Sequence, residues 1–311
     1  MPLLDIILGY DCNLSCTYCT ITPQMRQRSL AAPAVATALA QGRRDGYDHL
    51  SITGGEPTIF GTLLPLVRRA RSLGYADIKV QSNGLLWTPA NVARAIEAGV
   101  TRFAVSIHAH RRTHYEAIVR RPDTYDAMVG GLRTLADAAQ ASGIHVSADV
   151  IVMRSTLPEL ADAIGWLAEL GLRHADLWFV SLTDGNADNV DSMPAMTEAM
   201  PAIRAALAEG RRRAMTVRSL HVPRCLLGDD RAHAFDPASV GVRVMSPDAT
   251  FDLARSRITG QIHVPACAGC EHESYCPGLR EDYLARFGDA EIARARGVEP
   301  SRPGAVRLPL A

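Results

Sequence analysis

The chain has 311 residues, of which 47% are hydrophobic, and its 33 lysines and arginines balance 33 acidic residues. This length allows one large domain with a small appendage. Zero net charge gives no electrostatic reason to expect nucleic acid or an anionic membrane as a partner. No apolar segment is long enough to span a bilayer, and the N-terminus carries no cationic leader, so we expect a cytoplasmic protein.

The cysteines fall into two groups separated by two hundred residues. The first group, Cys12, Cys16 and Cys19, has the spacing C-x3-C-x2-C and follows an apolar run from Leu3 to Leu8 that predicts a strand. The second group consists of Cys225, Cys267, Cys270 and Cys276, the last followed by Pro277 and Gly278. An odd total of seven cysteines in tight spacings favours metal binding over disulfides in a reducing compartment.

The chain between these groups alternates between β-prone and helical segments. Such alternation implies a parallel α/β sheet, and six strand-helix units predict a partial (βα)6 version of the TIM-type barrel. Ligands of such folds lie at the carboxyl ends of the strands. After the first strand, the expected strands cover 49–53, 77–82, 102–108, 145–153 and 175–182, with helices over 31–44, 63–73, 89–98, 125–142, 157–170 and 196–213.

The pattern loosens after residue 214. A β-prone run from Thr216 to Val222 precedes a polar stretch punctuated by Pro and Gly, in which a bound centre would replace a core. We therefore expect a barrel domain over 1–214, a small cysteine-rich C-terminal cap over 215–290, and a tail over 291–311.

The cysteine loop resembles the signature of the radical S-adenosylmethionine (radical SAM) superfamily. A second mark of that family, Gly54-Gly55-Glu56-Pro57, follows the next predicted strand. The resemblance implies that Cys12, Cys16 and Cys19 hold a catalytic 4Fe-4S cluster whose open iron binds S-adenosylmethionine. It also implies an electron donor such as flavodoxin or ferredoxin. A zinc knuckle is the alternative, but no fourth ligand lies near the loop in sequence.

The resemblance extends to residues that would contact the cofactor. Tyr18 holds the aromatic position beside the adenine, and the alternative is a core aromatic residue. Gly54 and Gly55 would let the backbone approach the ligand, and Glu56 would accept a hydrogen bond from its ammonium group. The remaining candidates stand after the third and fourth strands: Ser82, Asn83 and Ser106.

Neighbouring residues have less defined roles. Ser82 and Asn83 are equally suited to forming a turn. His108 and His110 follow Ser106, and a histidine can serve as an acid or base. Arg120 and Arg121 are best interpreted as solvated surface residues.

The second cysteine group is similar to the end of the auxiliary-cluster extensions of radical SAM enzymes, the SPASM and Twitch types. Arg280 stands where the full SPASM pattern has another cysteine. Four thiols, Cys225, Cys267, Cys270 and Cys276, then suffice for one auxiliary 4Fe-4S cluster. A zinc ribbon is one alternative. In another, Cys225 is a free thiol that returns a hydrogen atom to a substrate radical.

We therefore expect an enzyme that cleaves S-adenosylmethionine and abstracts a hydrogen atom in an oxidation, epimerisation or bond formation. The first cluster cysteine is residue 12, which leaves no room for an N-terminal peptide-recognition domain and favours a small metabolite or natural product. A peptide delivered by a separate partner is the alternative. A hypothesis of another class is an iron-sulfur or zinc scaffold or sensor without turnover.

Overall fold

The computed structural model describes residues 2–235, 240–255, 262–276 and 278–300. Pro277 and residues 301–311 of the predicted tail lie outside these ranges.

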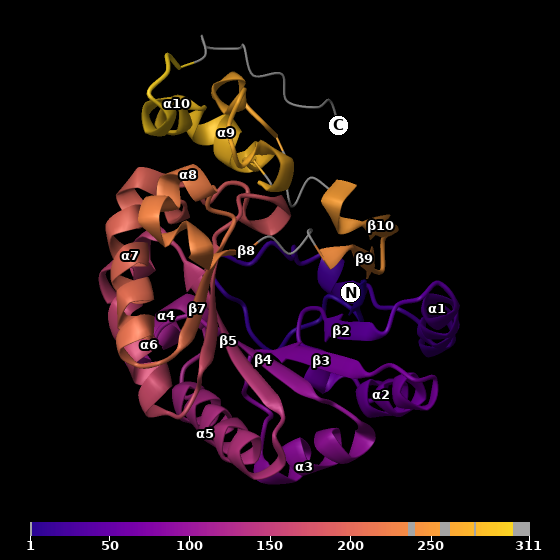
Figure 1. The fold of residues 1–311 in the computed structure, drawn as a ribbon. Helices are drawn as coiled ribbons and strands as arrows, with labels where there is room; N and C mark the ends of the chain where they lie inside the picture. Colours follow the sequence, from indigo (N-terminus) through magenta and orange to yellow (C-terminus); the bar gives the residue numbers. More distant parts are fainter. Residues whose placement is uncertain (1, 236–239, 256–261, 277, 301–311) are drawn as a thin grey trace.

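One curved sheet organises the described chain, and its strands are ordered β10-β9-β1-β2-β3-β4-β5-β6-β7-β8 (Figure 1). All neighbouring strands are parallel except β10, which runs antiparallel to β9. The strands are β1 (Leu3–Ile7), β2 (His49–Thr53), β3 (Asp77–Ser82), β4 (Arg102–Ile107), β5 (His145–Val152), β6 (His174–Phe179), β7 (Thr216–Leu220), β8 (Ala234–Phe235), β9 (Val242–Met245) and β10 (Thr250–Asp252).

Helices cover the outer face of this sheet, and the last two helices lie beyond its end beside α8 (Figure 1). Their ends follow local sequence signals: Pro89 opens α3 behind the Thr88 cap, and Gly143 ends α5 with a φ of 69°. The helices are α1 (Ala32–Arg44), α2 (Leu63–Ser72), α3 (Pro89–Ala98), α4 (Arg112–Val119), α5 (Tyr125–Ser142), α6 (Leu160–Glu169), α7 (Met196–Arg212), α8 (Arg224–Leu227), α9 (Glu281–Phe287) and α10 (Ala290–Arg296).

The α/β class and the partial barrel are confirmed. The predicted helices 89–98 and 125–142 have the predicted ends, whereas the strand predicted over 175–182 is shorter and occupies His174–Phe179. The sequence analysis did not predict α4, α9 or α10.

The sheet also continues past the six predicted units. The strand β7 pairs with β6, and β9 from the polar stretch pairs with β1 through Leu3 and Val242. The predicted boundary at 214 therefore stands before a strand that belongs to the same sheet.

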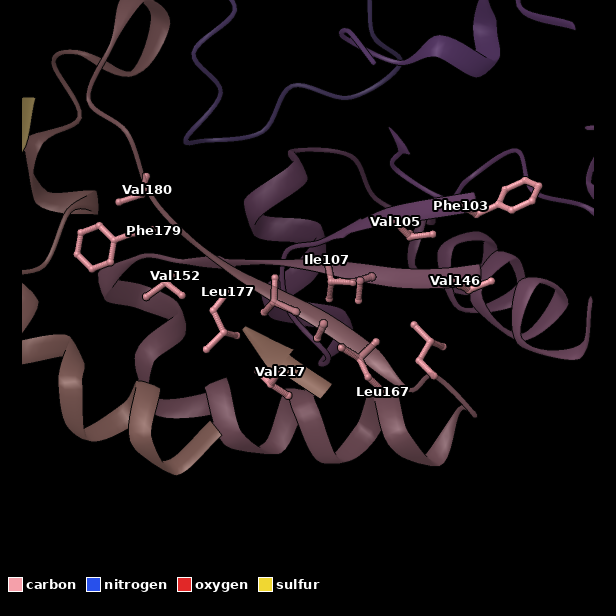
Figure 2. Packing of buried hydrophobic residues seen from close by; sticks show 14 of the residues in the cluster. Phe103, Val105, Ile107, Val146, Val152, Leu167, Leu177, Phe179, Val180 and Val217 are labelled. Atoms are coloured by element: carbon pink, nitrogen blue, oxygen red, sulfur yellow. The ribbon is translucent and has the colours of Figure 1, made fainter. Parts of the chain in front are cut away.

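Side chains alternate between the two faces of the sheet. The apolar side chains of β4 to β7 point outward and pack with the helices, as Ile107, Leu177 and Val217 do (Figure 2). The opposite positions face the interior of the barrel and are mostly polar, as Lys79 on β3 and Asp149 on β5 are. Bulky branched residues usually fill such an interior. Here it holds cavities instead.

No helix in the described ranges is both long and apolar enough to cross a bilayer.

Candidate active site

The cysteine loop after β1 is held in place by hydrogen bonds that its backbone carbonyl groups accept from arginine side chains. Arg26 donates hydrogen bonds to the carbonyls of Cys12 at 3.0 Å and of Leu14 at 2.7 Å. Arg121, which is exposed as predicted, also donates to the carbonyl of Asn13 at 2.6 Å. Three carbonyls of one short loop are thus satisfied by guanidinium groups, which pins the loop while its side chains stay available.

The end of the helix α4 supports the same loop. Its last residues accept hydrogen bonds from the loop, from Ser15 N to Val119 O at 3.3 Å and from Thr17 N to Ile118 O at 2.8 Å. These are carbonyls that the end of a helix leaves unpaired. The unpredicted helix therefore has a direct role in shaping the cysteine loop.

Cys12, Cys16 and Cys19 line one cavity of about 350 Å³ at the carboxyl ends of the strands, which we call the upper cavity. Burial, reinforced by the neighbouring Cys19 and Cys12, raises the pKa of the Cys16 thiol to about 12. Burial is also the main cause of the raised pKa of Cys12. A metal centre binds thiolates, so its binding would release protons from this site.

His108 lies in the same cavity, only 3% exposed, with Nε2 3.2 Å from Cys16 Sγ. Its ring also contacts Tyr18, with ring centroids 5.5 Å apart. Burial lowers the pKa of His108 to about 4, so the imidazole is neutral at pH 7. His110 faces Glu159 instead, at 3.5 Å.

The Gly-Gly-Glu segment packs directly on the start of the cysteine loop. Gly55 N donates to Gly9 O and Glu56 N donates to Asp11 O, both at 2.9 Å. A Cβ atom on Gly55 would lie 2.1 Å from Asp11 O, and one on Gly54 would lie 2.4 Å from Gly9 O. Glycine is therefore required here by two backbones in contact.

Glu56 is fully buried and does not line the upper cavity, although its charge contributes to the raised pKa of Cys12. Its expected hydrogen bond to the ammonium group of the cofactor stays a prediction. Its Oε1 accepts from Thr58 N at 3.0 Å, and its Oε2 accepts from Asn83 N at 2.7 Å. The carboxylate thus joins the segment after β2 to the turn after β3. Burial is the main cause of its raised pKa.

The other predicted contacts come together as expected from the sheet. Tyr18, Gly54, Gly55, Ser82, Asn83 and Ser106 all line the upper cavity. Asn83 Nδ2 donates to Asn13 Oδ1 at 2.6 Å, so the turn after β3 also holds the cysteine loop. The sequence analysis missed Gln81, Asp149 and Trp178 in this lining. These residues occupy alternate positions of β3, β5 and β6, which face the barrel interior, and this alternation is the sequence pattern that could have predicted them.

These features fit an iron-sulfur cluster. Three thiols open on one cavity, Leu14 N donates to Cys12 Sγ over 3.4 Å, and His108 Nε2 lies within hydrogen-bond distance of Cys16 Sγ. Donors of this kind stabilise thiolate charge. Within the described ranges, no group of three or more His, Cys, Asp or Glu side chains is arranged to hold a single metal ion.

Four cysteines of the second group converge on a separate cavity of about 20 Å³. Cys225 comes from α8 and Cys267 from a short 3-10 helix (Pro265–Cys267), and Cys270 and Cys276 come from the following loop. Burial raises the pKa of Cys225 to about 11, and the three other cysteines reinforce the shift.

Arg280, at the position where a further cysteine was considered, joins the cap to the barrel. Its guanidinium donates to Phe179 O at 3.0 Å, to Ser181 Oγ at 2.8 Å and to Val180 O. It also pairs with Asp282, which accepts from Leu182 N at 2.8 Å. This buried pair docks the cap on the end of β6.

The model of the radical SAM superfamily matches residues 6–166 of this chain. The chain belongs to the radical SAM superfamily. Among curated proteins, it is 28% identical over 180 residues to a probable GTP 3',8-cyclase of Saccharolobus solfataricus, covering 57% of this chain and 56% of that protein. A second probable GTP 3',8-cyclase, from Sulfurisphaera tokodaii, is 25% identical over 170 residues, covering 54% of this chain and 53% of that protein. The chain thus spans about half the length of these relatives.

Solved structures share the fold at low sequence identity. Streptococcus suis SuiB bound to S-adenosylmethionine superposes with a TM-score of 0.62 and 12% identity, covering 93% of this chain and 65% of that chain. Coproporphyrinogen III oxidase (HemN) from Escherichia coli, a radical SAM enzyme, superposes with a TM-score of 0.51 and 16% identity. The match covers 68% of this chain and 53% of that chain. Membership of this superfamily implies a 4Fe-4S cluster and S-adenosylmethionine.

Proposed function

We propose that this chain reductively cleaves S-adenosylmethionine at a cluster held by Cys12, Cys16 and Cys19, and modifies a small metabolite or natural product. The convergence of the three thiols with His108 on one cavity carries this proposal. When bound, the cluster supplies the electron for cleavage to methionine and a 5'-deoxyadenosyl radical, which takes a hydrogen atom from the substrate.

The protein's own contribution is positioning and the exclusion of water. Arg26, Arg121 and α4 fix the cysteine loop, so the thiols keep their mutual geometry. His108, a neutral imidazole, holds its Nε2 3.2 Å from the Cys16 sulfur. Tyr18, Asn83 and Ser106, with Gly54, Gly55 and Ser82, offer the surface on which S-adenosylmethionine would lie.

The test is S-adenosylmethionine cleavage by the anaerobically reconstituted, dithionite-reduced protein. We expect 5'-deoxyadenosine from the wild type and none from Cys16→Ala, because two thiols cannot hold the cube. A Ser15→Ala variant in the same loop is the matched control and should retain cleavage. Retained activity in Cys16→Ala refutes the assignment of Cys16 as a cluster ligand. Zinc in the purified wild type, or a wild type that forms no 5'-deoxyadenosine, refutes the proposed enzymatic function.

We also propose that Cys225, Cys267, Cys270 and Cys276 hold a second 4Fe-4S cluster. Four thiols from two distant segments line the same cavity, and Cys225 faces the other three instead of lining the upper cavity. This favours ligation over the hydrogen-donor role. The iron content of Cys225→Ala should decrease toward one cluster per chain. An unchanged iron content with loss of product would instead support Cys225 as a hydrogen-atom donor.

The substrate is best supported as a small molecule. The curated relatives are named for a reaction of GTP, a small molecule, whereas another structure of SuiB contains a precursor peptide. The upper cavity continues into the barrel interior through shared lining residues, and a compact molecule suits that enclosed space. A peptide supplied by a partner is the alternative, and an external donor such as flavodoxin or ferredoxin would deliver the electron.

A further inference from the structure

A second cavity of about 400 Å³ occupies the barrel interior toward the amino ends of the strands. We call it the lower cavity. Three residues line both cavities and lie where the two meet: Gln81, Asp149 and Trp178. A molecule in the lower cavity would therefore present one end to the space where S-adenosylmethionine is proposed to lie.

Two groups of charges around the lower cavity are already neutralised by each other. Arg218 forms a bidentate pair with Asp176, with both N–O distances at 2.6 Å. Asp77 accepts from Arg102 at 3.2 Å and pairs with His49 at 3.1 Å. These residues are engaged with protein partners and leave little charge for a ligand.

Three further charges in the lining have no such partner. Asp5, Lys79 and Asp149 form no ion pair within the described part of the chain, although Lys79 lowers the pKa of both acids. Burial still dominates, and it raises the pKa of Asp149 to about 6, so this carboxylate is mostly ionised at neutral pH. The unpaired groups of the cavity are thus two acids and one lysine.

Uncompensated polar atoms point to a ligand with several hydrogen-bonding groups. Among the described residues, the buried atoms Asp5 Oδ1, Ser51 Oγ, Asp149 Oδ2 and Trp178 Nε1 form no hydrogen bond of good geometry. Ser51 and Trp178 lie close enough to lower the pKa of Asp5 and Asp149, respectively, so the two pairs compensate each other only in part. Ser51 is only 1% exposed. A buried polar atom that stays unsatisfied destabilises the fold, so a ligand that bonds with it binds more tightly. The four atoms come from β1, β2, β5 and β6, and all four residues line the lower cavity.

Lys79 is the only lysine in the sequence, because every other residue among the 33 lysines and arginines is arginine. Arginine prefers planar, bidentate partners, whereas an ammonium group is compact and donates in three directions. A lone ammonium among unpaired polar atoms suits hydroxyl and carbonyl oxygens of a small ligand.

We propose that the lower cavity is the substrate site, and that it takes a compact molecule with a protonated amine and several hydroxyl groups. The amine lies against the carboxylates of Asp5 and Asp149. The hydroxyls bond with Ser51, Trp178 Nε1 and Lys79. This assignment rests on the proposed function, because it places the C–H bond to be cleaved where the two cavities meet.

The test compares three six-carbon probes that differ only at one end: glucamine (an amine), sorbitol (neutral) and gluconate (an anion). Their binding to the reconstituted protein is measured by calorimetry at neutral pH. We expect glucamine to bind at least about tenfold more tightly than the other two, which corresponds to about 1.4 kcal/mol. Equal binding of sorbitol, or tighter binding of gluconate, overturns the proposal.

Variants locate the site. Asp5→Asn and Asp149→Asn preserve the shape of the side chain and should each weaken glucamine binding at least tenfold. Lys79→Met should weaken the binding of sorbitol and glucamine alike. Asp137→Asn, an exposed acid on α5, is the control and should match the wild type. Wild-type protein that forms 5'-deoxyadenosine but binds no glucamine refutes this inference alone. Wild-type protein that binds glucamine but forms no 5'-deoxyadenosine refutes the proposed function and leaves the lower cavity as a binding site without the assigned substrate role.

Discussion

Arg280 and Asp282 are expected to hold the cysteine-rich cap on the barrel. The guanidinium is 4% exposed and the carboxylate 8%, and together they satisfy the backbone after β6. Removing one member of a buried ion pair leaves the other charge uncompensated and typically costs about 3–5 kcal/mol. We therefore expect Arg280→Met to lower the free energy of unfolding by about this amount.

A double-mutant cycle isolates the pair. In Arg280→Met with Asp282→Leu both charges are gone, so part of the loss should be recovered, with a coupling free energy of about 2 kcal/mol. The carbonyls of Phe179 and Val180 still lose their donor, so recovery should be incomplete.

The assay is anaerobic urea denaturation followed by tryptophan fluorescence. Arg94→Met, at an exposed site on α3, serves as the control and should change stability by less than about 0.5 kcal/mol. A loss below about 1 kcal/mol in Arg280→Met, or losses that simply add in the double variant, would refute the reasoning.

Two further predictions concern the barrel. Gly55→Ala should destabilise the cysteine loop by about 1–3 kcal/mol and reduce bound iron, because the new Cβ would meet Asp11 O at 2.1 Å. Gly61→Ala, with open space around it, should behave as the wild type, and equal iron in both variants would contradict the packing argument. Asp149 has a raised pKa of about 6 against 3.8, so its ionisation opposes folding and stability is lost as pH rises through about 6. In urea denaturation, the free energy of unfolding of Asp149→Asn should thus increase relative to that of the wild type by up to about 3 kcal/mol between about pH 4 and pH 8. A difference between the two proteins that does not change with pH would contradict this prediction.

Several roles assigned from the sequence acquire a different physical basis in the fold. Gly54 and Gly55 were expected to admit a ligand, and they admit the backbone of Gly9 to Asp11. Glu56, for which a cofactor contact stays a prediction, accepts hydrogen bonds from Thr58 and Asn83. Sequence shows which residue types a strand end carries, but only the packed chain shows which partner each one meets.

Local patterns were enough to predict the class of fold. The alternation of strands and helices, with stops at residues such as Gly99 and Gly143, depends on the chemistry of neighbouring residues. The spacing of Cys12, Cys16 and Cys19 likewise brings three thiols together within one loop. For these features the local sequence is the main physical cause, and the distant α4 and Arg121 then fix the cysteine loop.

Other features depend on contacts between distant segments, which no local pattern specifies. The polar neighbourhood of Val242–Met245 concealed a strand, because its stability comes from pairing with β1, which is distant in sequence. Lys79, Asp5 and Asp149 are unremarkable in sequence, and they become one unpaired group only when three strands curve around the same interior. The sequence therefore determined most of the strands and helices of the barrel and the spacing of its cysteines, whereas the register and curvature of the sheet decided what the barrel interior can bind.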